Sequence, residues 1–234
     1  MIDKNNIEIL IPTLNEEGNI GETIKNLKSN NYNNITIIDD NSKDDTVKIS
    51  KELGCNVLKN SNLSRMGFGN SLIKAFQNSK SKYCCIFDGD NSFDPKSLDI
   101  MVDKINNKSD FVFCSRYKDN NISEDDTLIR KFGNFFFTKL VNVLFKIGTT
   151  DVLFLYVMGK REDFLSLDLN SKDFRICTEI LLKCYNNFTC TEILSIERKR
   201  KFGKSKVNAA LDGFKILMNI FHYYIKSFSN KKLI

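Results

Sequence analysis

The stretch "CCIFDGDNSFDP" (Cys84–Pro95) places two aspartates, Asp88 and Asp90, directly after a short apolar run. Two like charges at the end of a buried strand repel each other unless a cation or a proton lies between them. Gly89, which separates them, has no Cβ and therefore allows a close approach to the backbone. Hard divalent ions take oxygen ligands, often one or two carboxylates together with substrate phosphates. The pattern therefore suits a divalent cation that bridges to a diphosphate, although two aspartates at this spacing also occur in ordinary turns.

Short apolar runs alternate with helical patterns through the first half of the chain, and this order predicts an α/β fold. Gly54 follows one helical pattern at the place where a left-handed residue ends a helix. Asp94 and Pro95 are placed as the N-cap and first residue of another helix. Strands that alternate with helices indicate a mostly parallel sheet covered on both faces. The runs of strand length are Ile7–Ile11, Ile35–Ile38, Tyr83–Phe87 and Phe111–Ser115, with a weaker one at Asn56–Leu58.

Polar residues follow the carboxyl ends of several of these expected strands. Ligands of open α/β sheets bind in the crevice outside the carboxyl ends of the strands. We therefore expect these residues to converge on one cleft. They are Pro12 and Glu16 after the first strand, Asp39 and Asp40 after the second, Asp88 and Asp90 after the run at 83–87, and Arg116 after the last.

The composition fits one globular domain with room for an appendage, since 41% of the 234 residues are hydrophobic and 27% are charged. The net charge of +6 is a mild bias, so we expect no nucleic-acid partner. The opening "MIDKNN" does not resemble a signal peptide, and the seven cysteines lack metal-ligand spacing, which favours a cytoplasmic protein. Cys84 and Cys85 are adjacent in a strand and are expected in the core on opposite faces of the sheet.

The second half contains two apolar helical segments. The first, Arg130–Gly148, is apolar on nearly every side, and the second is a stripe between Leu211 and Phe228. They are interpreted either as helices packed on each other or on a dimer partner, or as interfacial helices on a bilayer. No stretch reaches the roughly 18 uncharged apolar residues of a membrane-spanning helix. We therefore expect a domain at 1–206, which includes the helix at about 130–148, and an amphipathic helix and tail at 207–234.

Several stretches, in order and over almost the whole length, make the chain similar to the family 2 glycosyltransferases of GT-A (Rossmann-like) fold. The resemblance is to the dolichol-phosphate mannosyltransferase-like, polyprenyl-phosphate branch of that family. The stretches that carry it are "IPTLNEEGNI" (Ile11–Ile20), "IIDDNSKDDT" (Ile37–Thr46), "SRMGFGNSLIKAF" (Ser64–Phe76), "IFDGDNSFDP" (Ile86–Pro95), "CSRY" (Cys114–Tyr117) and "RKFGKSK" (Arg200–Lys206).

The resemblance implies a pocket for a nucleotide sugar at the carboxyl ends of the strands. Pro12, Leu14 and Glu16 would line the nucleotide pocket, and the family more often has tyrosine at the place of Leu14. Ile38 and Asp40 would contact the base and the ribose.

The resemblance also implies a metal and phosphate site. Asp88 and Asp90, with Gly89 between them, would hold Mg²⁺ or Mn²⁺ on the diphosphate of the donor, and Ser92 stands where the family often has a glutamine ligand. Arginine suits phosphate because its planar guanidinium can donate two hydrogen bonds at once, and lysine suits it as a compact positive charge. The cations that would gather phosphate charge from donor or acceptor are Arg116, Arg200 and Lys206.

The basic run "ERKRKFGKSK" (Glu197–Lys206) is interpreted in two ways. Such a run is typical of a solvated face or a mobile loop, and it also suits an anionic ligand or an anionic membrane surface. The segment from Arg198 to Lys206 is poor in packing residues, with Gly203 near its centre. On the second interpretation it closes over the site when donor or lipid phosphate binds.

We expect a hexosyltransferase that inverts the anomeric carbon as the acceptor displaces a metal-held diphosphate. The donor would be of GDP-mannose or UDP-glucose type and the acceptor polyprenyl or dolichyl phosphate, with the enzyme peripheral on the cytoplasmic face of a membrane. Two alternatives stay open: a glycosyltransferase with a glycan or other hydroxyl acceptor, and a catalytically silent nucleotide-binding scaffold. A hydroxyl acceptor requires a general base, for which Glu179 is the nearest candidate. Glu179 can equally be interpreted as a helix residue that caps a cation of the pocket.

Overall fold

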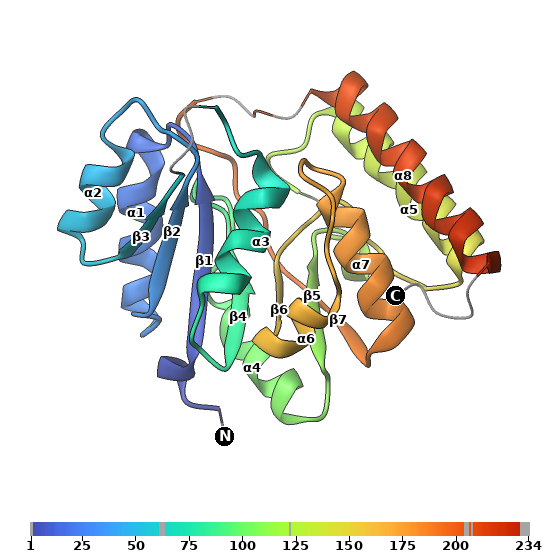
Figure 1. The fold of residues 1–234 in the computed structure, drawn as a ribbon, viewed down its shortest axis with the longest axis horizontal. Coiled ribbons are helices and arrows are strands. Elements are labelled where there is room, and N and C mark those ends of the chain that lie inside the picture. Colours follow the sequence, from blue (N-terminus) through green and yellow to red (C-terminus); the bar gives the residue numbers. More distant parts are fainter. Residues whose placement is uncertain (1, 61–63, 122, 204–205, 207, 230–234) are drawn as a thin grey trace.

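A computed structural model describes residues 2–60, 64–121, 123–203, 206 and 208–229. Its centre is a seven-stranded sheet in the order β3-β2-β1-β4-β6-β5-β7 (Figure 1). Only β6 runs antiparallel to its neighbours β4 and β5, and the other pairs are parallel. The mostly parallel sheet predicted from the sequence is confirmed. The strands are β1 Ile7–Thr13, β2 Ile35–Asp39, β3 Asn56–Lys59, β4 Tyr83–Ile86, β5 Phe111–Ser115, β6 Val157–Lys160 and β7 Cys190–Leu194.

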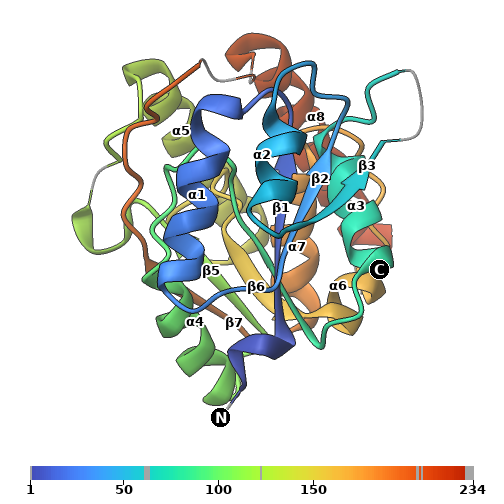
Figure 2. The same ribbon diagram turned by 90° about the vertical axis from the view of Figure 1, so that its left-hand side faces the viewer.

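Helices cover both faces of the sheet, as the alternating pattern predicts. Figure 2 shows α1 and α4 on one side of the sheet and α3, α6 and α7 on the other. The α-helices of the described residues are α1 Glu17–Ser29, α2 Thr46–Glu52, α3 Phe68–Asn78, α4 Ser97–Asn106, α5 Leu128–Phe145, α6 Arg161–Ser166, α7 Ile176–Asn187 and α8 Ala209–Ser229.

The five inner strands, β1, β2, β4, β5 and β6, are buried on both faces, so each contributes side chains to two separate cores, whereas the edge strands β3 and β7 are partly exposed. In β4, Cys84 belongs to the core under α3 and α7, whereas Cys85 belongs to the core under α1 and α4, and both are fully buried. This confirms the expected placement of the two cysteines. It also explains why the strands are near-continuous apolar runs and not alternating ones.

Two strands were not predicted, and one helix begins later than predicted. β6 and β7 are short, and β6 contains Gly159, whose Cβ position lies only 2.4 Å from the ring of Phe111. β6 can therefore pack beside Phe111 only because residue 159 is a glycine, and the hydrophobic periodicity of the sequence does not show this requirement. α4 begins at Ser97 and not at Pro95. Asp94 nevertheless caps the preceding turn, since its Oδ1 accepts from the Lys96 N–H at 3.4 Å and its carbonyl accepts from the Ser97 N–H at 3.2 Å. The same Oδ1 lies 3.3 Å from Nη2 of Arg198.

The two apolar segments of the second half form α5 and α8, which lie side by side at one edge of the molecule (Figure 1). They run in the same direction, because Gly213 faces Phe137 and, further along, Tyr224 contacts Phe145 at a ring-centroid distance of 5.9 Å. Ile220 of α8 is fully buried in the core shared with α7. No helix among the described residues is long and apolar enough to cross a membrane.

The expected division of the chain at residues 206 and 207 stays a prediction. Part of the expected second segment, namely residue 207 and the tail at 230–234, lies outside the described residues. α8 packs on α5 and α7 and shares their core.

The amino end of α3 is fixed by a backbone contact that only glycine permits. The N–H of Gly69 donates to the carbonyl of Lys172 at 3.0 Å, and a Cβ on Gly69 would lie 2.0 Å from the carbonyl oxygen of Ser171. This contact brings Phe68 and Phe174 into a stacked pair with ring centroids 4.9 Å apart.

We expect Gly69→Ala to lower the free energy of unfolding by about 2 kcal/mol or more, because the added methyl group has no space against backbone. Gly133→Ala is the matched control, since nothing lies within 4 Å of its Cβ position in the helix α5. The control should be neutral or stabilising by about 0.5–1 kcal/mol. Urea unfolding followed by circular dichroism measures both, and equal stabilities for the two variants would contradict the packing argument.

Candidate active site

One cavity of about 520 Å³ opens beside the carboxyl ends of the strands and has a polar end and an apolar end. Pro12, Asp88, Asp90 and Arg116, which the sequence predicts to converge, all line it. The predicted convergence of strand-end residues is confirmed for these four. The apolar end extends between the first halves of α5 and α8, and its lining includes Ile129, Phe132, Phe136, Phe137, Phe214 and Leu217.

The aspartate pair lies at the polar end, where Asp90 is held more tightly than Asp88. Asp90 is 3% exposed; its Oδ1 accepts from the Ser92 N–H at 2.9 Å, and its Oδ2 lies 2.5 Å from a terminal nitrogen of Arg200. Burial raises the pKa of Asp88 well above its ordinary value, and the neighbouring Asp90 raises it further, while Arg200 opposes the shift. The two carboxylates are therefore an electrostatically costly pair that favours a cation.

Gly89 packs closely against β1. A Cβ on Gly89 would meet the side chains of Thr13 and Ile11 at 3.2 and 3.3 Å. Glycine therefore permits a close approach to β1 here, and its expected place beside the donor stays a prediction.

The aspartate pair fits a divalent ion that takes most of its ligands from substrate and water. Arg200 places a guanidinium on Asp90, which shows that these carboxylates attract positive charge. Among the described residues there is no group of three or more histidine, cysteine, aspartate or glutamate side chains placed to hold a metal. Mg²⁺ in particular is commonly bound by one or two carboxylates together with phosphates, so Asp88 and Asp90 would hold the ion.

Arg116 is buried in a cluster of carboxylates. Its Nε and one terminal nitrogen bind Asp151 in a bidentate manner at 2.7 and 2.9 Å. The other terminal nitrogen lies 3.3 Å from Glu197 and 3.5 Å from Asp126. Burial alone would lower the pKa of Arg116, but Asp151 raises it, with smaller contributions from Glu197 and Asp126. The guanidinium lines the cavity, and in this structure all its nitrogens bind carboxylates.

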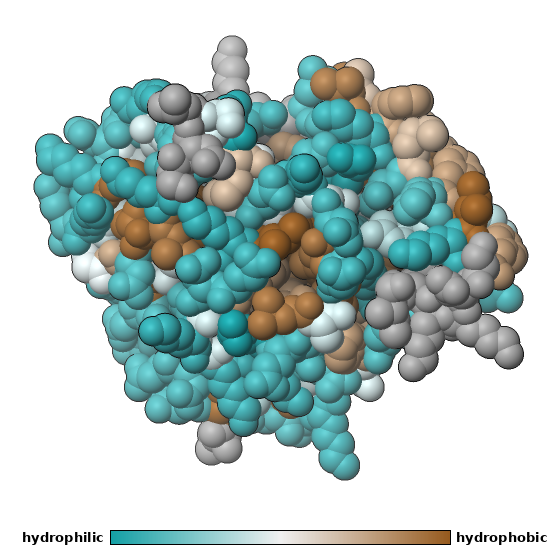
Figure 3. Space-filling model, viewed as in Figure 1, coloured by the Kyte–Doolittle hydropathy of each residue, from teal (hydrophilic) through white to brown (hydrophobic). Residues whose placement is uncertain are grey.

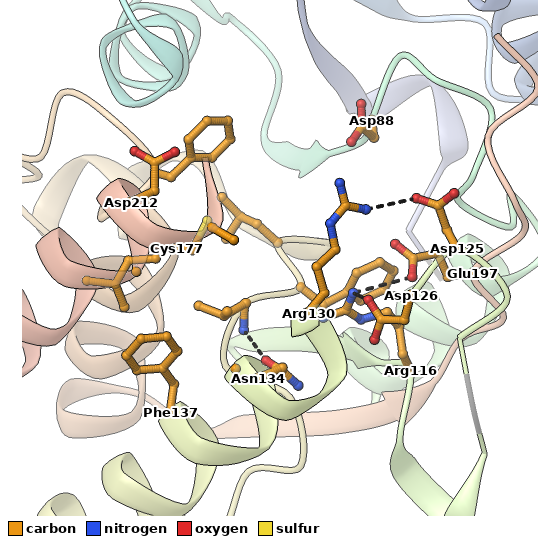
Figure 4. Close-up of a pocket in the computed structure, with 18 of the residues that line it drawn as sticks. Asp88, Arg116, Asp125, Asp126, Arg130, Asn134, Phe137, Cys177, Glu197 and Asp212 are labelled. Atoms are coloured by element: carbon orange, nitrogen blue, oxygen red, sulfur yellow. Dashed lines mark hydrogen bonds and ion pairs between the residues drawn. The ribbon is translucent and has the colours of Figure 1, made fainter. Parts of the chain in front are cut away.

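Arg130, Asp125 and Asp126 are among the polar residues of the cavity that the sequence did not point to. Arg130 comes from the first turn of α5, and its guanidinium extends towards Asp88 (Figure 4). It pairs with Asp125 at 3.4 Å, and Asp126 follows on the same loop. The adjacent like charges of Asp125 and Asp126 are the same kind of signal as Asp88 and Asp90. Arg130 and Lys131 are adjacent cations at the start of an apolar segment, and the sequence does not show which of the two faces the cavity.

The other residues assigned to donor binding divide into two groups. Glu16 is buried; its Oε1 lies 2.5 Å from Nζ of Lys206 and 3.6 Å from a terminal nitrogen of Arg200. Lys206 also donates to the carbonyl of Leu14. Glu16, Arg200 and Lys206 line a second, polar hollow next to the first cavity. The structure thus brings Leu14, Glu16, Arg200 and Lys206 together at one mouth of the site.

Ile38 and Asp40 depart from their expected positions. Ile38 is fully buried within β2, so its side chain belongs to the core and offers no surface to a nucleotide. Asp40 is 6% exposed and accepts from the N–H groups of Met66 and Gly67 at 2.5 and 3.1 Å and from the Asn60 amide at 3.0 Å. Asp40 thus holds the segment before α3 in place, and neither residue lines either cavity.

Glu179 is a structural residue in this fold and is unsuited to be a base. It is fully buried, accepts from the N–H groups of Asn170 and Ser171 at 2.9 and 2.8 Å, and pairs with Lys183 at 3.0 Å. Although burial opposes it, these bonds lower the pKa of Glu179. Its alternative interpretation, a helix residue that caps a cation, agrees with the contact to Lys183.

The sheet, the aspartate pair after β4 and the adjoining cavity define an α/β glycosyltransferase of GT-A fold. The chain belongs to glycosyl transferase family 2, whose model matches residues 8–167. It is 31% identical over 229 residues to the uncharacterised protein MJ1222 of Methanocaldococcus jannaschii, over 94% of this chain and 92% of that protein.

A second relative has a named activity. The chain is 30% identical over 203 residues to the UDP-N-acetylglucosamine–dolichyl-phosphate N-acetylglucosaminyltransferase of Methanococcus voltae, over 77% of this chain and 80% of that protein. Among solved structures, glucosyl-3-phosphoglycerate synthase from Mycobacterium tuberculosis, in complex with Mn²⁺, UDP-glucose and phosphoglyceric acid, superposes with a TM-score of 0.75. That match covers 92% of this chain and 78% of the other at 14% identity, and it shows the shared fold.

We expect Asp151→Asn to lower the free energy of unfolding by about 3 kcal/mol or more. Asp151 is buried, and removal of its charge leaves the Arg116 guanidinium without its bidentate partner in a buried position. Asp45→Asn is the control, because Asp45 pairs with Lys48 at 4.0 Å with both side chains about two-thirds exposed, and such a pair contributes about 0–1 kcal/mol. Chemical denaturation compares them; a loss below about 1 kcal/mol for Asp151→Asn would show that the buried pair is dispensable.

Proposed function

We propose that this glycosyltransferase moves a hexose from a nucleotide diphosphate sugar to polyprenyl or dolichyl phosphate, with a divalent metal and with inversion. The donor is of the GDP-mannose or UDP-glucose type. The observation that carries the proposal is a single cavity that joins carboxylates and arginines at one end to an apolar channel between α5 and α8 at the other. A lipid phosphate has the same division into an anionic head and an apolar chain.

The donor side consists of residues from both halves of the chain. Asp88 and Asp90 hold Mg²⁺ or Mn²⁺, which when bound offsets the negative charge that develops on the leaving diphosphate. Arg200 and Lys206, which lie beside Glu16 at the mouth, donate hydrogen bonds to the phosphates. Pro12 forms part of the cavity wall next to the aspartates.

The acceptor side consists of Arg130 and the apolar helices. The guanidinium of Arg130 extends into the cavity near Asp88 (Figure 4), where it can bind an acceptor phosphate close to the donor. A lipid phosphate is already anionic near neutral pH, so its oxygen attacks the anomeric carbon without a strong general base. Arg116 lines the same cavity, where Asp151, Glu197 and Asp126 hold its guanidinium.

The lipid chain reaches the cavity from a membrane surface on which α5 and α8 lie. Figure 3 shows apolar surface along the edge that α8 forms. Lysines such as Lys131 and Lys139 are exposed beside these side chains and suit anionic headgroups. We place the enzyme as a peripheral protein on the cytoplasmic face of such a membrane. The exposed apolar side chains of the two helices include Leu128, Ile129, Phe132, Phe135, Leu211, Phe214, Met218 and Ile225.

One observation favours a hydroxyl acceptor as the second candidate. Asp126 lines the cavity with its side chain 5% exposed, and its Oδ2 is buried without a hydrogen-bond partner among the described residues. Burial raises the pKa of Asp126, although Arg116 opposes the shift. A carboxylate of this kind can take a proton from an acceptor hydroxyl, which a phosphate acceptor does not require.

The test is nucleotide diphosphate release with Mn²⁺ and a panel of sugar nucleotides, with and without a short polyprenyl phosphate. We expect Asp90→Asn to lower metal-dependent turnover by a factor of about 100 or more with the fold intact, because its charge is lost where the leaving group is stabilised. Asp103→Asn, an exposed aspartate of α4, serves as the control. Undiminished turnover in Asp90→Asn would contradict the proposed metal site.

The same assay separates the two acceptor classes. Asp126→Asn should leave transfer to polyprenyl phosphate within a few-fold of wild type, because that reaction needs no base. If the acceptor is a hydroxyl compound and Asp126 is its base, kcat should fall by a factor of about 100 or more. A large loss with polyprenyl phosphate as acceptor would therefore count against the proposed role of the lipid phosphate.

Binding to vesicles tests the membrane surface independently of catalysis. The double variant Phe132→Ser, Phe214→Ser should bind vesicles of phosphatidylcholine with anionic phosphatidylglycerol at least about tenfold more weakly, since two large apolar side chains are lost from the contact. Ile100→Ser is the matched control, because Ile100 is 46% exposed on α4, away from both helices. Co-sedimentation measures binding, and equal losses in both variants, or no binding by wild type, would refute the surface.

A further inference from the structure

The segment after Glu197 docks onto the amino end of α1 through contacts that fix its backbone. The side-chain amide of Asn19 accepts from the N–H of Phe202 at 3.2 Å and donates to its carbonyl at 3.1 Å. The ring of Phe202 packs on Gly18, where a Cβ would lie 3.0 Å from it. Lys201 pairs with Glu22 at 2.7 Å. The basic segment is thus seated at a defined place across the mouth of the site.

This docking places Arg200 directly on the carboxylates of the metal site. One terminal nitrogen lies 2.5 Å from Asp90 and the other 3.6 Å from Glu16, while the backbone N–H of Arg200 donates to Asp125 at 3.1 Å. The side chain is 15% exposed, so these pairs are partly shielded from water. An ion pair in such a position is much stronger than an exposed one.

A divalent ion at Asp88 and Asp90 and the guanidinium of Arg200 compete for the same carboxylate. Oδ1 of Asp90 is already engaged by the N–H of Ser92, and Oδ2 is the oxygen that Arg200 contacts. A metal that binds Asp90 through Oδ2 must displace the guanidinium. The displaced group stays beside the ion, because its backbone is held by Asp125 and by the docked Phe202.

We propose that Arg200 is an exchangeable internal cation: it neutralises Asp90 and Glu16 until a divalent ion takes its place, and it then turns to the diphosphate of the donor. This inference rests on the proposed metal-dependent function. It assigns to Arg200 two opposite effects, since the side chain weakens the binding of the metal alone and strengthens the binding of the metal together with the donor. A residue that only binds phosphate affects the metal alone no more than its charge does.

The exchange couples the metal to the donor. The bare ion must compete with a charge that is already in place, so its affinity is low. With the donor present, Arg200 gains phosphate oxygens as new partners, and the cost of leaving Asp90 is offset. The site therefore favours the metal–nucleotide complex over the free ion.

The experiment is a titration of the full chain with Mn²⁺ alone, in which electron paramagnetic resonance measures the free ion. Arg200→Ala should bind Mn²⁺ about tenfold more tightly than wild type, which corresponds to about 1.4 kcal/mol. Arg200→Lys, which retains a charge, should stay closer to wild type. Arg198→Ala is the matched control, because it removes the same charge from the same segment, where Arg198 contacts Asp94 and neither Asp90 nor Glu16.

A second measurement separates exchange from misfolding and from a change in net charge. In the presence of Mn²⁺, Arg200→Ala should bind the nucleoside diphosphate at least about tenfold more weakly, with a thermal midpoint close to that of wild type. Tighter metal binding combined with weaker nucleotide binding is the signature of exchange. Loss of both affinities would mean that Arg200 is only structural, and an equal gain in Arg198→Ala would mean that only net charge matters.

The outcome also distinguishes this inference from the proposed function. If Mn²⁺ binds wild type, Asp90→Asn abolishes that binding, and Arg200→Ala leaves it unchanged, then exchange is refuted while the metal site stands. If neither wild type nor Arg200→Ala binds Mn²⁺ at millimolar concentrations, or if Asp90→Asn does not weaken binding in the Arg200→Ala background, then the metal site and the exchange fail together.

Discussion

The structure depends on cations that neutralise the carboxylates lying at the carboxyl ends of the strands. Asp88 and Asp90 follow β4, and the buried cluster around Asp151 lies next to the end of β5. Carboxylates this close cannot all be charged and desolvated without cations. Arg116 and Arg200 supply the charge from segments distant in sequence. The electrostatic requirement therefore ties the second half of the chain to the first.

The apolar helices begin beside these charges. Arg130 and Asp125 pair at the start of α5 and both line the cavity, and α8 lies along α5, where Ile216 and Ile220 complete the adjacent core. The two helices then continue past the core and leave one side without protein partners among the described residues. A polar reaction site and an apolar channel thus arise as neighbours from one packing arrangement.

Local patterns in the sequence were sufficient for the first five strands and for the aspartate pair, because apolar runs and adjacent like charges are local signals. They were insufficient where a long-range contact decides. β6 depends on Gly159 beneath Phe111, 48 residues earlier in the chain. Ile38 was assigned to the donor pocket from its place in a motif, but every residue of β2 is buried and the Ile38 side chain belongs to the core. A motif match alone does not show that one of its residues lies inside a strand that is covered on both faces.

In the basic segment, neighbouring side chains differ in how far they are exposed to solvent, and this difference distinguishes the residue that enters the cavity from those at the surface. Sequence left two interpretations for Arg198–Lys206, and the structure divides the residues between them. Lys201 pairs with Glu22 where the lysine side chain is 56% exposed, a setting in which an ion pair contributes little. Arg200, its neighbour, is 15% exposed and contacts two buried carboxylates. The backbone of the segment is held instead by the bonds of Asn19 to Phe202 and of Asp125 to the Arg200 N–H. These contacts direct the Arg200 guanidinium into the cavity, while Lys201 stays at the surface.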